Sequence, residues 1–188
     1  MTLIQFSTGI SVLLVLSQIA LVGGWGAYLC SKKFRIWCLS LVSERAWMGA
    51  TLIVAIVSMV SSLVYSNAYD LAVCELCYYQ RLCMYPQVLF LWVAVWKKDY
   101  ASIRLSALIL ALIGAAIAGY HYYYHVLSFF TTETVMMPCS TIGLVPSCAQ
   151  KYILIFGFIT IPLMALIAFL LIASGLYLSA QSSRKHQI

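Results

Sequence analysis

The sequence has very little charge. Asp, Glu, Lys and Arg together make up 9% of its 188 residues, whereas hydrophobic residues make up 64%. Soluble globular proteins carry about 25% charged and about 45–50% apolar residues. So few charged side chains cannot cover the surface of a soluble fold of this length. The composition therefore excludes a soluble enzyme, a disordered chain and a nucleic-acid-binding module, and it indicates an integral membrane protein.

Stretches without charge predict where the chain crosses the membrane. A spanning helix needs about 20 apolar residues, and four charge-free stretches reach that length: 1–31, 46–68, 105–132 and 152–183. A fifth, 82–96, has only 15 residues, so it spans only if its helix reaches back across Arg81. The sequence therefore predicts five transmembrane helices, at about 7–29, 46–68, 76–96, 103–124 and 152–179.

Acidic residues are the scarcer charge, with 5 Asp and Glu against 11 Lys and Arg. Five helices put nine basic residues on one face and only Arg81 and Lys151 towards the other. Lys and Arg are enriched in cytoplasmic loops, so the face with nine is predicted to be cytoplasmic. We therefore expect the N-terminus and the loops 69–76 and 125–151 outside the cytoplasm, and the C-terminus inside. The nine residues are Lys32, Lys33, Arg35, Arg45, Lys97, Lys98, Arg104, Arg184 and Lys185.

Cys74 and Cys77 form a C-x-x-C motif at the predicted start of a helix. Their sulfurs are near enough to bridge, and a helix N-terminus stabilises the thiolate that thiol–disulfide exchange requires. The predicted topology puts the motif outside the cytoplasm, where disulfides persist. These features favour a redox site. A structural bridge and half of a zinc site are the alternatives, but no second C-x-x-C completes a zinc site, so no metal is expected.

Two ionisable residues accompany the motif. Arg81 shares a helix face with Cys77 and lies about one turn inside the span, where an ionisable residue is costly and functional by default. We expect it to stabilise the Cys77 thiolate and to donate hydrogen bonds to an anionic oxygen of an acceptor in the bilayer; snorkelling to the interface is the alternative. His121, near the outer end of its helix, is a candidate for the same acceptor site. Its alternatives are interfacial packing and metal binding with His125.

Cys139 and Cys148 form a second candidate pair in the long loop between the last two helices. The segment between them holds a glycine and a proline, so the chain can turn back. A mobile pair beside the C-x-x-C motif suggests a relay between a large soluble partner and the membrane; a structural loop staple is the alternative. The other three cysteines are expected to be reduced thiols that pack as small hydrophobes: Cys30, Cys38 and Cys83.

These motifs resemble the disulfide bond formation protein B (DsbB) family, specifically its shorter Gram-positive-type branch, often called BdbC. The resemblance covers about 46–178 and implies an all-α integral membrane protein with a four-helix transmembrane bundle. This chain adds one N-terminal transmembrane helix, which gives three parts: 1–45 with the added helix and a cytoplasmic loop, 46–180 with the four-helix domain, and 181–188 as a cytoplasmic tail. The matching stretches are Cys74–Arg81, Met84–Pro86, His121–Tyr122, Pro138–Cys148, Lys151–Tyr152 and Phe156–Pro162.

The resemblance also implies a function, that of a quinone-coupled thiol oxidase in the bacterial cytoplasmic (inner) membrane. Its partners are then a thioredoxin-fold, DsbA-like thiol oxidase outside the cytoplasm and the quinone pool of the lipid, ubiquinone or menaquinone, with no nucleic acid. A Cys139–Cys148 disulfide takes electrons from the partner, with Cys139 in the mixed disulfide, and passes them to a Cys74–Cys77 disulfide. By the same resemblance Cys77 lies against the quinone, and Arg81 and His121 match quinone-site residues.

Two other functions are compatible with the motifs. A non-enzymatic membrane assembly or transport subunit would carry the same four outer cysteines as two structural disulfides, with reduction potentials below about −300 mV. A relative of the vitamin K reductases would share the chemistry. Those enzymes have their C-x-x-C late in the chain, whereas here the motif opens a middle helix.

Overall fold

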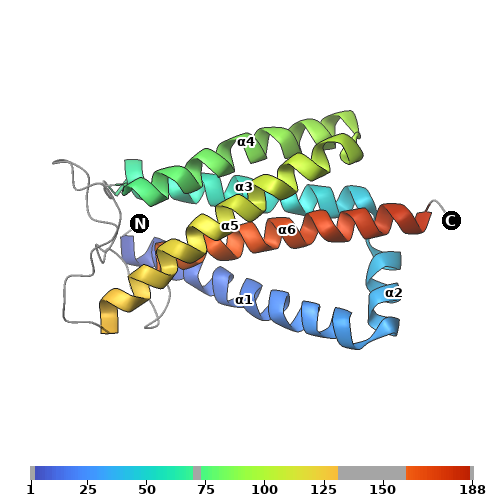
Figure 1. Ribbon diagram of the computed structural model, residues 1–188, viewed down its shortest axis with the longest axis horizontal. Coiled ribbons are helices and arrows are strands. Elements are labelled where there is room, and N and C mark those ends of the chain that lie inside the picture. Colours follow the sequence, from blue (N-terminus) through green and yellow to red (C-terminus); the bar gives the residue numbers. More distant parts are fainter. Residues whose placement is uncertain (1–2, 70–72, 131–159, 187–188) are drawn as a thin grey trace.

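Within the described residues, the protein is built from α-helices joined by short connections. The computed structural model describes residues 3–69, 73–130 and 160–186, in which all regular secondary structure is α-helix. Long helices run side by side along the longest axis, and the short α2 lies across one end (Figure 1). The helices are α1 (Leu3–Cys30), α2 (Lys32–Leu41), α3 (Glu44–Asn67), α4 (Glu75–Lys97), α5 (Tyr100–Phe130) and α6 (Ile161–His186).

Polar side chains mark the starts of three helices. Ser31 and Ser43 precede α2 and α3, and each hydroxyl oxygen accepts a hydrogen bond at 3.3 Å from the backbone N–H three residues later. Such acceptors satisfy the backbone donors that a helix start leaves unpaired. Cys74 has the same position before α4, and its sulfur accepts from the backbone N–H of Cys77 at 3.4 Å. The C-x-x-C motif therefore also caps its own helix.

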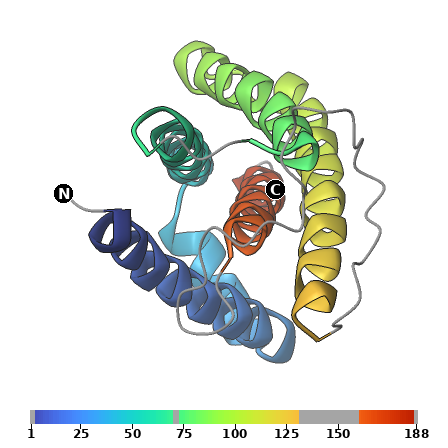
Figure 2. The ribbon, with the colours of Figure 1, turned by 90° about the vertical axis from the view of Figure 1, so that its left-hand side faces the viewer.

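Helix α6 forms the centre of the bundle. Seen end-on, it is surrounded by α3, α4, α5 and α1 (Figure 2). Its Phe169 and Leu176 are fully buried and share one apolar core with Met48 of α3 and Leu91 of α4. Helix α5 comes very close at Gly114, where a Cβ atom would lie only 2.4 Å from the Phe169 ring. A glycine at this position therefore sets the α5–α6 distance.

All five predicted helices are present, with changed bounds. Helices α1, α3, α4 and α5 begin one to four residues earlier than predicted, and α5 continues to Phe130. The predicted start of the last helix at 152 is wrong, because Thr160 is not helical and α6 begins at Ile161; residues 152–159 lie outside the described residues. Helix α2 was not predicted, since the basic side chains of Lys32, Lys33 and Arg35 interrupt any charge-free stretch.

Four of the described helices are long and apolar enough to cross a membrane: α1, α3, α5 and α6. Helix α4 is not among them, because Gln80, Arg81 and Gln87 lower its mean hydropathy. It is nevertheless long enough, at 23 residues, and it packs beside α3 and α5. That α1 is a fifth span, added to a four-helix membrane bundle, stays a prediction.

The two ends of the bundle differ in chemistry. Helix α2 and the C-terminal ends of α4 and α6 lie at one end, and the starts of α1, α4 and α6 lie at the other (Figure 1). An ion pair between Arg104 of α5 and Glu44 of α3 joins two helix starts at the first end, and the Ser182 hydroxyl of α6 donates to the Val42 carbonyl at 3.2 Å. The basic residues predicted to share one face belong to segments that meet at this end. Cys74 and Cys77 lie at the opposite end.

Candidate redox site

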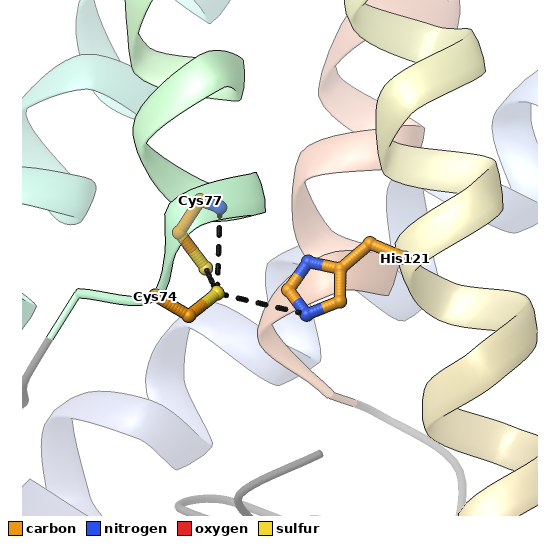
Figure 3. Close-up of side chains that lie close together, drawn as sticks. All are labelled: Cys74, Cys77 and His121. Atoms are coloured by element: carbon orange, nitrogen blue, oxygen red, sulfur yellow. Dashed lines mark hydrogen bonds between the residues drawn. The ribbon is translucent and has the colours of Figure 1, made fainter. Parts of the chain in front are cut away.

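Cys74 and Cys77 lie side by side at the start of α4. Their Sγ atoms are 3.0 Å apart as separate thiols that share a hydrogen bond (Figure 3). Cys74 is buried, at 5% exposure, and Cys77 is half-buried. One helical turn thus brings the two sulfurs together, as the i, i+3 spacing predicts. The arrangement suits exchange between a dithiol and a disulfide without movement of the backbone.

His121 of α5 faces this pair across the bundle. Its Nε2 atom lies 3.9 Å from the Cys74 Sγ atom (Figure 3), and its side chain is buried. The sequence predicted His121 at an acceptor site but gave no reason to expect a contact with a cysteine. The helices bring together two residues that are 47 positions apart.

Gln80 orients this histidine, and sequence reasoning did not select it as a site residue. Its Nε2 atom lies 3.2 Å from the Nδ1 atom of His121, and both side chains are buried. An amide nitrogen can only donate, so Nδ1 accepts in this contact and the ring proton is on Nε2. That proton points towards the Cys74 sulfur. Gln80 therefore makes His121 a hydrogen-bond donor to Cys74. In metal sites, the group bonded to the second ring nitrogen of a histidine fixes its tautomer in the same way.

The surroundings of Cys74 favour its thiolate. The hydrogen bond with the Cys77 thiol is the largest cause that lowers the pKa of Cys74, which precedes α4. Burial opposes this effect, and the hydrogen bond from His121 adds to it. Both hydrogen bonds favour the charged sulfur over the neutral one. Cys74 is thus the more readily ionised thiol that an exchange reaction needs.

Arg81 is fixed against α3. Its Nε atom donates to the Ser62 hydroxyl at 2.8 Å, and a terminal nitrogen donates to the Ser62 backbone carbonyl at 2.7 Å. A guanidinium has five N–H donors, so these two bonds leave three for another acceptor. The stabilisation of the Cys77 thiolate by Arg81 stays a prediction. The helix contact itself argues against a side chain that simply snorkels to the interface.

A cavity of about 350 Å³ joins these residues. Cys74, Cys77, Gln80, Arg81 and His121 all line it. The rest of its wall is mostly apolar, and α3 adds a polar strip next to Arg81. Predicted site residues from α4 and α5 therefore open into one space of the size of a small-molecule site. The polar strip consists of Ser58, Ser61, Ser62, Tyr65 and Ser66.

The same residues form a group that could hold a metal ion. The ligand atoms of Cys74, Cys77 and His121 all lie within 4.8 Å of one another. Two thiolates and an imidazole with an open fourth position are a ligand set of catalytic zinc sites. The sequence places no further ligand next to the C-x-x-C, but the fold supplies one, His121, from a distant helix. The predicted absence of metal stays a prediction.

Other cysteines divide into two groups. Cys139 and Cys148 lie outside the described residues, so their predicted pairing stays a prediction. Cys83 is buried in the apolar core, away from the site, as expected for a packing thiol. Cys38 is half-buried and Cys30 is exposed, so the expected packing role does not hold for Cys30.

Comparisons with known proteins agree with this chemistry. Residues 44–179 match the family model described as "Disulfide bond formation protein DsbB". The chain is 42% identical over 126 residues to "Disulfide bond formation protein C" of Bacillus subtilis (strain 168), a match that covers 67% of this chain and 86% of that protein. It is 44% identical over 118 residues to the "Probable disulfide formation protein" of Oceanobacillus iheyensis, covering 63% and 77% of the two chains. No solved structure matches it.

Proposed function

This chain belongs to the disulfide bond formation protein DsbB family, and from that premise we propose that it is a membrane thiol oxidase that transfers electrons from an extracytoplasmic thioredoxin-fold protein to a quinone. Membership in the family implies a multi-pass membrane protein with a disulfide oxidoreductase role. The quinone, the thioredoxin-fold partner and the path between them are the proposal. The observation that carries it is the C-x-x-C pair, with His121 beside it, opening into a cavity that also holds Arg81.

The cavity fits a quinone. A quinone ring is flat and largely apolar with two carbonyl oxygens, which match a mostly apolar space with hydrogen-bond donors along one side. Arg81 would bind a carbonyl oxygen, because its guanidinium is fixed by Ser62 and keeps further donors. When bound, a quinone supplies an acceptor for two electrons and two protons. Oxidation of the Cys74 and Cys77 thiols to a disulfide releases two electrons and two protons.

Residues of the protein then have separate tasks in this proposal. Cys74 and Cys77 carry the exchangeable electrons as a dithiol or a disulfide. His121 stabilises the Cys74 thiolate through its Nε2–H, and Gln80 holds the ring in the required tautomer. Arg81 provides positive charge in the cavity, where negative charge develops on reduction of the acceptor.

The second pair would complete the path. A reduced partner attacks the Cys139–Cys148 disulfide, so that the partner is oxidised and the pair becomes a dithiol. That dithiol then reduces a Cys74–Cys77 disulfide and regains its own. Helix α5 ends and α6 begins at the end of the bundle that holds Cys74 and Cys77 (Figure 1). The described residues on both sides of 131–159 therefore lie at the same end of the bundle as the C-x-x-C, which supports this path.

Orientation and location follow from the charge distribution. We propose that the basic end faces the cytoplasm of a bacterium and that the cysteine end faces outwards. The N-terminus is then outside and the C-terminus inside. In this arrangement the four-helix domain at 46–180 spans the cytoplasmic membrane, with the helix in 1–45 as an additional span and 181–188 as a cytoplasmic tail.

A quinone-reduction assay tests the proposal. Purified protein in lipid nanodiscs is given a reduced thioredoxin-fold dithiol and ubiquinone or menaquinone, and quinol formation is followed by absorbance. Cys77→Ser is expected to abolish quinol formation. Cys83→Ser is the matched control, since this buried thiol lies in the same helix but outside the cavity, and it should retain the wild-type rate. Quinol formation at the normal rate by Cys77→Ser would disprove the electron path.

A non-enzymatic assembly or transport subunit makes the opposite prediction. Both disulfides would then be structural and would resist mild reductants. Titration of the protein in redox buffers of known potential separates the two cases, because structural bridges fall below about −300 mV. The hydrogen bonds of Cys74 favour the redox enzyme, since a structural bridge gains nothing from a stabilised thiolate.

A further inference from the structure

Helix α1 contributes to the cavity although it lies outside the family match. The match begins at residue 44, whereas Ile10, Leu13, Leu14 and Ser17 of α1 line the same cavity as Cys77. One wall of the proposed acceptor site therefore comes from the segment that this chain adds to the matched domain.

Contacts along α6 hold α1 in this position. Leu14 is only 9% exposed and packs with Leu163 and Ile167 of α6. Further along, the Trp25 indole N–H donates to the Ser174 hydroxyl at 3.0 Å. The rings of Trp25 and Tyr28 also pack against Tyr177, with ring centroids 5.6 and 6.5 Å away. Contacts at the middle and near the C-terminal end of one face make α1 a fixed wall rather than a loose neighbour.

The opposite side of the cavity is formed by α3. Ile53 and Val57 of α3 and Leu13 of α1 line the cavity, yet 62%, 52% and 65% of their surfaces are exposed. Seen end-on, α1 and α3 lie on the same side of α6 (Figure 2). Apolar side chains that line a cavity and remain exposed form an opening between these two helices. That opening has the chemistry of an apolar chain and not of a charged ligand.

We propose that α1 is the lateral wall of the acceptor site and that the apolar tail of the quinone passes between Leu13 of α1 and Ile53 and Val57 of α3. This inference rests on the proposed function and adds a specificity-determining residue to it. The ring would lie near Arg81, deeper in the cavity, and the tail would leave towards the bilayer. Leu13 would then discriminate between acceptors by the bulk of their tails, while it has no contact with the reacting atoms.

Two matched variants test the proposal kinetically. Leu13→Trp narrows the opening. Ile19→Trp places the same bulk elsewhere on α1, at a residue with the same 65% exposure that does not line the cavity. For a quinone with a decyl tail, Leu13→Trp is expected to raise KM about fivefold, which corresponds to about 1 kcal/mol. The KM for a tail-less quinone should not change. A wild-type kcat with that quinone would show that the variant is folded.

An unchanged KM for the decyl quinone in Leu13→Trp, or an equal rise in KM for both quinones, would overturn the proposal, as would the same increase in Ile19→Trp. A binding experiment separates this inference from the proposed function. Wild-type protein is irradiated with a quinone that carries a photoreactive group on its tail, and labelled peptides are identified by mass spectrometry. Label within residues 10–17 supports the wall even if no quinol forms in the activity assay. Label confined to α3, α4 and α6 refutes it.

Discussion

Replacement of His121 by alanine is expected to make the Cys74 thiol less acidic. The Nε2 atom of His121 lies 3.9 Å from the Cys74 sulfur, and a hydrogen bond that it donates there stabilises the thiolate but not the thiol. Its removal therefore raises the pKa of Cys74 towards that of an ordinary cysteine. Cys77 remains as a partner, so the pKa should stay below the ordinary value.

The size of the effect follows from the contact. Hydrogen bonds to charged groups contribute about 1.5–3 kcal/mol, and one pKa unit corresponds to about 1.4 kcal/mol. The contact at 3.9 Å is long, so the lower limit applies and the pKa should rise by about 1 unit. Well below the midpoint, the thiolate fraction and the alkylation rate fall about tenfold for each such unit.

Alkylation of the reduced protein measures this shift. Iodoacetamide is added over a range of pH, and the Cys74 peptide is quantified by mass spectrometry, so that the other cysteines do not interfere. His125→Ala is the control: it removes an equally buried imidazole one turn away on α5. Its midpoint for Cys74 should match the wild type. An unchanged midpoint in His121→Ala, or equal shifts in both variants, would refute the assigned hydrogen bond.

Three further predictions address the cavity, the metal group and the packing. Arg81→Lys should raise KM for quinone about tenfold, because an ammonium cannot reproduce the two-point contact with Ser62; reduction of the loop disulfide by the partner should not change. Added Zn²⁺ should bind Cys74, Cys77 and His121 of the reduced protein and slow its turnover. A chelator should restore the turnover rate, and prior oxidation of the C-x-x-C motif should prevent zinc binding. Gly114→Ala should destabilise the bundle by about 1–3 kcal/mol in thermal unfolding, since its new methyl meets the Phe169 ring. Gly119→Ala should be tolerated, because its nearest neighbour is 4.0 Å away.

Charge and length were sufficient to predict the positions of α1, α3 and α4 to within a few residues. In a bilayer, an apolar helix is bounded by the charged residues that flank it. The charged segments 32–45 and 97–104 therefore place the helix ends next to them to within a few residues. The same rule failed for α2, where basic and apolar side chains alternate around one short helix. It also failed at α6, where Pro162 in the first turn was compatible with a start at Ile161. Such starts depend on local capping, which a search for uncharged stretches does not detect.

The site was predictable only where its residues are neighbours in sequence. The pairing of Cys74 with Cys77 follows from helical spacing, and the depth of Arg81 follows from the length of α4. The contact between His121 and Cys74 depends on how α4 and α5 pack, and no local pattern encodes that packing. Gln80 did leave a signal, since an amide inside an apolar span needs a hydrogen-bond partner.

That signal alone could not identify its function. Helix α4 carries two buried glutamines, Gln80 and Gln87, separated by two turns. Gln87 donates to the backbone carbonyl of Ala107 at 3.0 Å and so joins α4 to α5. Gln80 also reaches α5, but its partner is an imidazole that in turn contacts a reactive sulfur. Both glutamines satisfy the hydrogen-bonding requirement of a buried amide through a partner on α5. Only the identity of that partner distinguishes the packing contact of Gln87 from the site contact of Gln80. Gln80→Leu should therefore change the pH profile of Cys74 alkylation, whereas Gln87→Leu should lower the unfolding temperature and leave that profile as it is.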